Sequence, residues 1–303
     1  MKVSVLIHNL NRGSILKVCL DSVCKQLYRP VEVIMLDAGS TDSSDEVIKN
    51  AQVKMVARGF EFKTIKCPKM GVAASRNYAA ERASGDLLCI IDNDACFVSE
   101  DSLGMTVQYF LTNPYLGVIS YRILKGDGDE LDPFSWVFRR PHDAWVNTYF
   151  RTFTFVGCGC CVRRKAFQEV GGFWGHLKYS REEEDMGLGL IDKGWEIGYA
   201  PDIRIRHYSD PRGRASIKER RYMELKNGLL IFWRRFPWPL AFMVSCGRIL
   251  TMTFKALCKE KEMPWSLLKA VLNAVKEWKD CKEARSQVSI RSSIKYFALH
   301  FMK

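Results

Sequence analysis

Three short apolar runs in the first hundred residues end abruptly at polar side chains, and this feature constrains the fold most. The runs cover residues 3–7, 31–36 and 87–91, and stretches with apolar residues at helical spacing separate them. Strands that alternate with helices are typical of a parallel sheet with helices on both faces. We therefore expect an α/β fold with a Rossmann-like, mostly parallel sheet flanked by helices.

Polar residues stand where each of these strands is expected to end. They are Asn9, Asp37 and the triplet Asp92-Asn93-Asp94. Ligands of open α/β sheets bind beyond the carboxyl ends of the strands, and two carboxylates at this spacing suit Mg²⁺ or Mn²⁺ bound to a diphosphate. The alternative is a turn that uses Asp and Asn for its own backbone hydrogen bonds. Asp37 is placed either to accept hydrogen bonds from a nucleoside or to cap the next helix.

Later segments are assigned from the same patterns. We expect a strand pair near residues 53–65, a helix over 71–83, a long irregular loop over 125–150 and a strand over 153–162. A helix is expected over 163–170, and another over about 182–193. From residue 215 onward the pattern is helical with few turn signals. The chain therefore divides into residues 1–210 and a helical extension, residues 211–303.

The positive charge of the chain is concentrated in its last third. The formal net charge is +12, and residues 204–303 hold 22 of the 46 Lys and Arg but 8 of the 34 Asp and Glu residues, a charge of +14. Such a surface meets anionic lipid, nucleic acid or water. The longest apolar run in the last third of the chain, residues 236–247, is shorter than the roughly 18 residues that a membrane span needs. It favours a buried helix or one in the membrane interface.

Several polar or reactive residues have ordinary interpretations when taken alone. The acidic run Glu182-Glu183-Glu184-Asp185 begins a helix, where carboxylates complement the helix dipole. His207 follows a strand-like segment. Three close cysteines within 158–161 have no partner pair at zinc-site spacing, so we expect buried thiols and no metal there. Because Met1-Lys2 leads directly into the first strand, we expect no secretory leader and a reducing cytosol.

The order of these motifs resembles that of the family-2 glycosyltransferases of the GT-A fold, over about residues 1–210. The matching segments are 3–12, 35–42, 71–77, 84–94, 163–173, Glu184-Asp185, and Pro201-Asp202 with His207. The chain departs from the family pattern at three places. His8-Asn9 replaces a usual Pro-Thr pair, Ala38 replaces a frequent acid, and Trp174 stands where an acid often follows Gly-Gly-Phe.

The resemblance implies inverting transfer of one sugar from a nucleoside-diphosphate sugar to a hydroxyl acceptor. It implies that Asp94 and His207 hold a divalent metal, Mn²⁺ or Mg²⁺, which neutralises the leaving diphosphate. Asp185 would be the general base and Glu184 would orient it or a donor hydroxyl. The remaining candidates would bind the nucleotide-sugar: Asn9, Arg12, Asp37, Arg76, Asp92 and Asn93.

The resemblance also bears on the setting. It implies surface polysaccharide or glycolipid assembly with a glycan or lipid-linked acceptor. The +14 charge of residues 204–303, together with an aromatic cluster there, predicts a cytoplasmic enzyme that is peripheral on the inner face of the plasma membrane, with an anionic membrane surface as a partner and no nucleic acid. The cluster comprises Leu229, Leu230, Ile231, Phe232, Trp233, Phe236, Trp238, Leu240 and Phe242. The alternative is that these side chains pack on the catalytic domain and the lysines are solvated.

One alternative is a nucleotidyl or dinucleotide-dependent enzyme. It is disfavoured because no G-x-G-x-x-G follows the first strand and no G-x-x-x-x-G-K-[ST] occurs in the sequence. The other is a non-catalytic basic module that binds membrane or nucleic acid on a nucleotide-binding fold.

Overall fold

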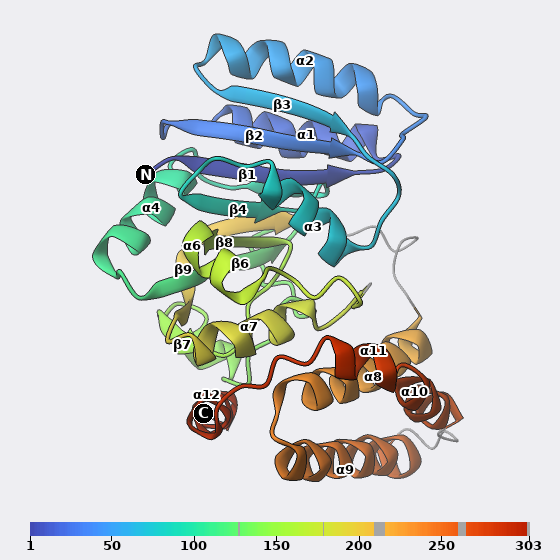
Figure 1. Ribbon diagram of the computed structural model, residues 1–303. Helices are drawn as coiled ribbons and strands as arrows, with labels where there is room; N and C mark the ends of the chain where they lie inside the picture. Colours follow the sequence, from blue (N-terminus) through green and yellow to red (C-terminus); the bar gives the residue numbers. More distant parts are fainter. Residues whose placement is uncertain (127, 178, 209–215, 260–264, 302–303) are drawn as a thin grey trace.

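A nine-stranded sheet forms the centre of the molecule (Figure 1). The computed structural model describes residues 1–126, 128–177, 179–208, 216–259 and 265–301. The strand order is β3-β2-β1-β4-β8-β6-β9-β5, and β7 pairs with β9. The strands are β1 (Val3–Asn9), β2 (Val31–Asp37), β3 (Glu61–Lys66), β4 (Leu87–Ile91), β5 (Ala95–Phe97), β6 (Leu116–Lys125), β7 (Phe150–Thr152), β8 (Gly159–Arg163) and β9 (Glu196–His207).

The first four strands are parallel, as the alternation of strands and helices predicts. β1 lies between β2 and β4, and the register pairs Asn9 with Asp37 at the carboxyl ends of β1 and β2. Beyond β4 the sheet is mixed, because β8 runs antiparallel to both β4 and β6. The expected α/β fold with a helical extension is confirmed, and the ends of β1, β2 and β4 share one edge.

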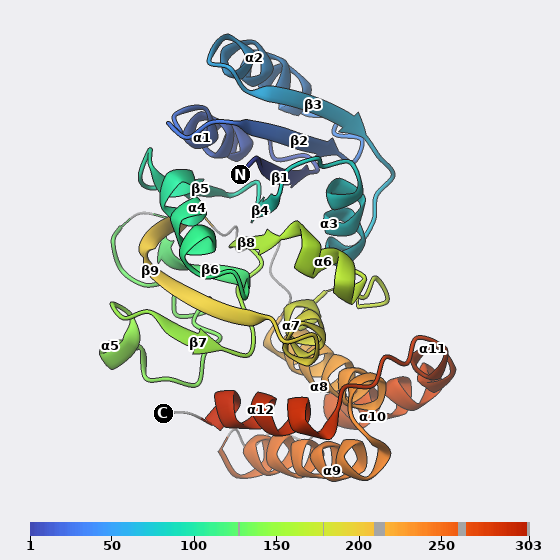
Figure 2. The same ribbon diagram turned by 60° about the vertical axis from the view of Figure 1, so that its left-hand side comes forward.

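Helices cover both faces of the sheet (Figure 2). Odd-numbered side chains of β1, such as Val5, pack towards α1, α2 and α4, whereas Leu6 packs towards α3, α6 and α7. This alternation follows from the two-residue period of a strand. The helices in this part are α1 (Gly13–Cys24), α2 (Ser44–Ala57), α3 (Val72–Glu81), α4 (Ser102–Thr112), α5 (His142–Trp145), α6 (Arg164–Val170) and α7 (Glu182–Asp192).

Two expected strands differ from the structure. Residues 53–57 belong to α2, because Ile48, Ala51 and Met55 bury one helical face, and only β3 forms in the expected pair. The expected strand over 153–162 forms only from Gly159, where β8 begins, and residues 153–158 connect it to β7, which ends at Thr152. These connecting residues line a hollow described below.

The helical extension packs on α7 through a third hydrophobic core. Leu188 and Ile191 of α7 join Leu229, Phe232 and other buried residues of the extension. The extension comprises α8 (Ile217–Arg235), α9 (Trp238–Phe254) with a π-helical turn (Lys255–Lys259), α10 (Trp265–Lys276), α11 (Trp278–Glu283) and α12 (Ile290–Phe301). In Figure 1 it lies below the sheet, with α9 outermost. The described part of the extension is therefore continuous with the folded core.

A buried ion-pair cluster joins α7 to the end of α8. Asp185 is fully buried, and its two carboxylate oxygens accept hydrogen bonds from Arg234 at 2.6 and 2.7 Å and from Arg235 at 2.8 Å. Burial opposes ionisation of Asp185, but the two arginines outweigh it and lower its pKa. Paired and fully hydrogen-bonded charges are the form in which a carboxylate is tolerated inside a protein.

We predict that Asp185→Ala destabilises the protein by about 3–5 kcal/mol, because it leaves buried cations unpaired. Asp129→Ala is the control, since Asp129 pairs with Arg206 at the surface and such pairs contribute little. Urea denaturation of both variants measures the difference. Equal losses for the two variants would show that the buried cluster does not hold the extension in place.

Candidate functional site

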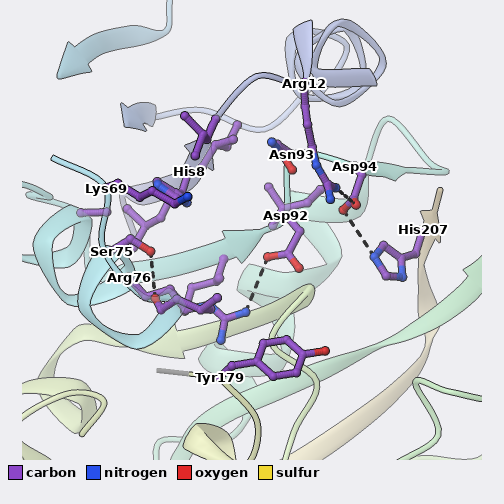
Figure 3. A pocket seen from close by; sticks show the side chains of 17 residues that line it. His8, Arg12, Lys69, Ser75, Arg76, Asp92, Asn93, Asp94, Tyr179 and His207 are labelled. Atoms are coloured by element: carbon purple, nitrogen blue, oxygen red, sulfur yellow. Dashed lines mark hydrogen bonds and ion pairs between the residues drawn. The ribbon is translucent and has the colours of Figure 1, made fainter. Parts of the chain in front are cut away.

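A pocket of about 710 Å³ opens beyond the carboxyl ends of β1 and β4 (Figure 3). Asp92, Asn93 and Asp94 follow β4 and form one wall, and Arg12 reaches in from the start of α1. His207 ends β9 and closes the same side. Residues far apart in sequence therefore meet here because their strands end at one edge.

Three of these side chains could hold a metal ion. One ligand atom each from Asp92, Asp94 and His207 lie within 4.8 Å of one another. His207 Nε2 lies 3.4 Å from Asp94 Oδ1, and its Nδ1 lies 3.5 Å from Asp132 Oδ2. A carboxylate behind a histidine fixes the orientation of the ring and is usual at metal sites. Two carboxylates and an imidazole therefore fit a divalent ion such as Mn²⁺.

The charges at this site are strongly coupled. Burial disfavours the charged form of His207, but the nearby carboxylates of Asp132 and Asp94 outweigh this effect and raise its pKa to about 9. Burial also opposes ionisation of Asp94, yet His207 and Arg12 lower its pKa. Arg12 forms an ion pair with the second oxygen of Asp94. Asp94 is therefore an ionised carboxylate held between two cationic groups.

Arg76 connects this wall to a second set of carboxylates. Its guanidinium lies 3.5 Å from Asp92, 3.3 Å from Glu182 and 3.1 Å from Glu183, and it is 8% exposed. A Cβ at Gly157 would lie 2.2 Å from Glu183 Oε1 and 2.4 Å from Arg76 Nη2. A side chain at this position would have to displace both groups, so the backbone between β7 and β8 lies directly against the cluster.

Glu182 and Glu183 begin α7 but have different surroundings. Glu182 is buried, and burial together with the charge of Glu183 raises the pKa of Glu182 to about 8, against the opposing charge of Arg76. The Glu183 side chain is 17% exposed. Both line a second hollow of about 880 Å³, which shares Arg76 and Asp92 with the first pocket. The two spaces therefore adjoin at the wall that these shared residues form.

Most of the residues predicted from the sequence meet in the first pocket. Those that line it are Arg12, Arg76, Asp92, Asn93, Asp94 and His207. Asn9 and Asp37 do not appear among its described lining residues. Both are fully buried, and the Asp37 carboxylate lies 2.7 Å from Lys66 Nζ. Asn9 donates hydrogen bonds to Ser44 Oγ and accepts one from Asn93.

The two acidic residues predicted for catalysis lie apart from the pocket wall. Asp185 is enclosed by Arg234 and Arg235, so this geometry does not suit a general base for an acceptor in the pocket. Glu184 pairs with Arg181 at 2.6 Å and accepts a hydrogen bond from Tyr296. It lines the second hollow.

Sequence reasoning missed Glu182, Glu183 and Asp132 as site residues. The two glutamates stand in the same acidic run as Glu184 and Asp185, the pair that resembles the family's E-D motif. The four acids point in different directions around one helical turn, and only tertiary contacts distinguish them. Asp132 lies in the expected loop, where a lone acid before a proline gave no signal. His8, which also lines the pocket, carries a buried Nε2 without a partner among the described residues.

The chain is similar in sequence to a known protein family and to several curated proteins. Residues 4–171 match the model of the family described as Glycosyl transferase family 2. The O-antigen chain rhamnosyltransferase RfbN of Salmonella typhimurium is 23% identical over 216 residues, which cover 68% of this chain and 66% of that protein. An uncharacterized glycosyltransferase of Haemophilus influenzae is 31% identical over 112 residues, covering 37% of this chain and 43% of that protein. The chain thus matches less than two thirds of the length of these curated relatives.

Solved structures share the fold at low identity. The Staphylococcus aureus protein TarS, residues 1–349 in complex with UDP-GlcNAc, aligns with a TM-score of 0.64 and 14% identity, covering 97% of this chain and 83% of that one. The mannosyltransferase PcManGT of Pyrobaculum calidifontis, in complex with GDP-Man and Mn²⁺, aligns with a TM-score of 0.60 and 18% identity. The alignment covers 98% of this chain and 78% of that one. The fold is therefore GT-A. With its motifs, its sheet and its family match in agreement, the chain belongs to glycosyl transferase family 2.

Proposed function

We propose that this protein is an inverting glycosyltransferase that moves one sugar from a nucleoside-diphosphate sugar to a hydroxyl acceptor. The proposal rests mainly on the wall, formed by Arg76 and Asp92, that the first pocket shares with the second hollow. A candidate metal site stands on one side of Arg76, and the carboxylates of α7 stand on the other. Displacement at an anomeric carbon needs charge neutralisation for the leaving group and a base for the attacking hydroxyl.

We assign the metal to Asp92, Asp94 and His207, with Asp132 orienting the imidazole. A bound divalent ion supplies Lewis-acid stabilisation of the departing diphosphate. The chain's own cations add to this effect, because Arg12 and Lys69 line the same pocket and present positive charge to phosphate oxygens. The fold similarity to PcManGT, solved with GDP-Man and Mn²⁺, and to TarS, solved with UDP-GlcNAc, supports this assignment.

We assign the general base to Glu183 in place of Asp185. We call the first pocket the donor pocket. Glu183 lines the second hollow beside it and is partly exposed, so an acceptor hydroxyl can approach Glu183. Its Oε1 is oriented by Arg76 Nη1 at 3.1 Å. Glu182 is less suited, because a carboxyl with a pKa of about 8 is protonated at neutral pH. In this scheme Glu183 takes the hydroxyl proton as the new bond forms.

The setting follows from the relatives and from one missing motif. Relatives named for O-antigen synthesis support a role in surface polysaccharide assembly on the cytoplasmic side of the membrane. Processive members of the family carry a Q-x-x-R-W element, and these 303 residues contain no such pentapeptide. We therefore propose that one sugar is added per encounter.

The outer face of the extension supports membrane association. One helical segment, Trp238–Cys258, has the length and hydropathy of a membrane span, and 17% of its most apolar window is buried. Of the aromatic cluster in this region, Phe232 and Phe236 are buried, whereas Phe242 is 70% exposed. The +14 charge of residues 204–303 favours an anionic surface. We propose that α9 lies in the membrane interface.

The metal assignment predicts that Asp94→Ala and His207→Ala abolish donor hydrolysis. Excess EDTA should abolish it in the unaltered protein, and Mn²⁺ should restore it. Asp21→Ala is the control, because Asp21 pairs with Lys17 on the surface of α1. Full hydrolysis in excess chelator would exclude a metal-dependent reaction.

The base assignment predicts that Glu183→Gln lowers the transfer rate by about 10²–10⁴ while donor binding is retained. Glu182→Gln is the matched comparison and should cost far less, since the amide resembles a carboxyl that already carries a proton at pH 7. Steady-state kcat and the Kd of the donor separate the two effects. A larger loss of kcat for Glu182→Gln would reverse the assignment.

Membrane association predicts that the protein floats with phosphatidylglycerol vesicles and stays behind with phosphatidylcholine alone. Salt should weaken the binding, since it screens surface charge. Phe242→Glu or Leu250→Glu should abolish flotation, whereas Leu111→Glu, at another exposed apolar position, on α4, should not. Equal flotation of all three variants would place the membrane contact elsewhere.

A further inference from the structure

The second hollow has an arginine-rich far wall. It shares Arg76 and Tyr179 with the donor pocket, and Tyr179 faces Asp92 across the opening in Figure 3. Its other side is lined by Arg181 before α7, Arg220 of α8 and Arg248 of α9. These cations come from three elements that meet where the extension docks.

Unsatisfied polar atoms gather in this hollow. Among the described residues, eight buried side-chain N or O atoms have no hydrogen-bond partner, and five belong to residues that line it. They are Nε of Arg181, Arg220 and Arg248, Glu182 Oε2 and His300 Nδ1. A buried donor without a partner costs free energy, so such groups call for a ligand or ordered water. Three of the five are N–H donors on cations, which favours an anion.

The ion pairs of the three arginines also favour an anionic ligand. Arg181 pairs with Glu184, and Arg248 pairs with Glu224. Arg220 has no ion pair with a described residue, and its guanidinium lies 5.5 Å from the ring centre of Phe134. Burial and the nearby charge of Arg181 lower the pKa of Arg248. The protein's own carboxylates therefore leave a positive excess at this wall.

The side of α9 that faces away from the hollow is apolar and exposed. Arg248 faces the hollow, and Leu250 stands about 200° around the helix from it. Phe242 and Leu250 are both 70% exposed, and Phe254 is 63% exposed. One helix thus joins an anion-attracting hollow to an apolar outer surface. A ligand that is itself amphiphilic, with an anionic group next to an apolar chain, matches both sides.

We propose that the second hollow binds a phosphate or diphosphate ester carried by the sugar acceptor. The proposal rests on the glycosyl transfer proposed above, since it treats this hollow as the acceptor site. The planar forks of Arg181, Arg220 and Arg248 suit phosphate oxygens, which accept several N–H bonds at once. The acceptor hydroxyl then lies towards Glu183, at the wall shared with the donor pocket.

Calorimetric titration with two probes tests the site in the full-length protein, without donor and in EDTA. The probes are inorganic phosphate and farnesyl phosphate in phosphatidylcholine vesicles. Arg220→Gln and Arg248→Gln should each weaken the binding of both probes by about tenfold. Lys218→Gln is the control, because this exposed cation of α8 removes the same charge without being among the residues that line the hollow. It should leave both affinities unchanged.

The two probes also identify the source of the phosphate. Tighter binding of farnesyl phosphate than of inorganic phosphate supports a lipid-linked acceptor, and equal affinities support a soluble phosphate ester. Unchanged phosphate binding in both arginine variants, or an equal loss in Lys218→Gln, would overturn the proposal.

Folding and the proposed transfer are tested separately. Arg220→Gln removes no ion pair with a described residue, so its far-ultraviolet circular dichroism should match that of the unaltered protein. If no donor is used as a substrate but phosphate binds through Arg220 and Arg248, the transfer function fails while the anion site stands.

Discussion

The contact of Asp185 with Arg234 and Arg235 constrains where the carboxylates at the start of α7 lie. It fixes the first turn of α7 against the end of α8, so the preceding Glu182 and Glu183 are directed towards Arg76. A buried carboxylate with two arginines has few alternative positions, because any displacement leaves charges unpaired in a medium that solvates them poorly. The extension therefore does more than cover the domain. It supplies the cations that set the orientation of α7.

Arg76 extends this constraint to the donor side. Its guanidinium is shared between Asp92 beyond β4 and the glutamates of α7, and Gly157 allows the backbone to close over it. The relative positions of the candidate metal site and the proposed base thus depend on one buried side chain. Preorganised charges of this kind stabilise developing charge without further rearrangement.

Much of the site could be anticipated from the sequence, because it lies at strand ends. Asp92 and His207 stand where buried strands end, and the carboxyl ends of parallel strands lie at one edge of the sheet. The sequence therefore predicts that these two side chains lie close together. The roles of the acids in α7 could not be anticipated. Glu182, Glu183, Glu184 and Asp185 stand in one turn, and their partners lie on α3, α8, α12 and the loop before α7. Asp37 likewise satisfied a strand-end pattern, yet Lys66 of β3 takes its carboxylate.

The anomeric configuration of the first-formed hydrolysis product tests the central account most directly, because water replaces the acceptor and none need be known. ¹H NMR recorded within the first turnovers, before mutarotation, distinguishes the anomers from a panel of α-linked nucleoside-diphosphate sugars with Mn²⁺. In-line displacement from the wall that carries Glu183 predicts the β anomer. Release of the α anomer would contradict a single displacement in this pocket, and with it the roles assigned to Glu183 and Arg76.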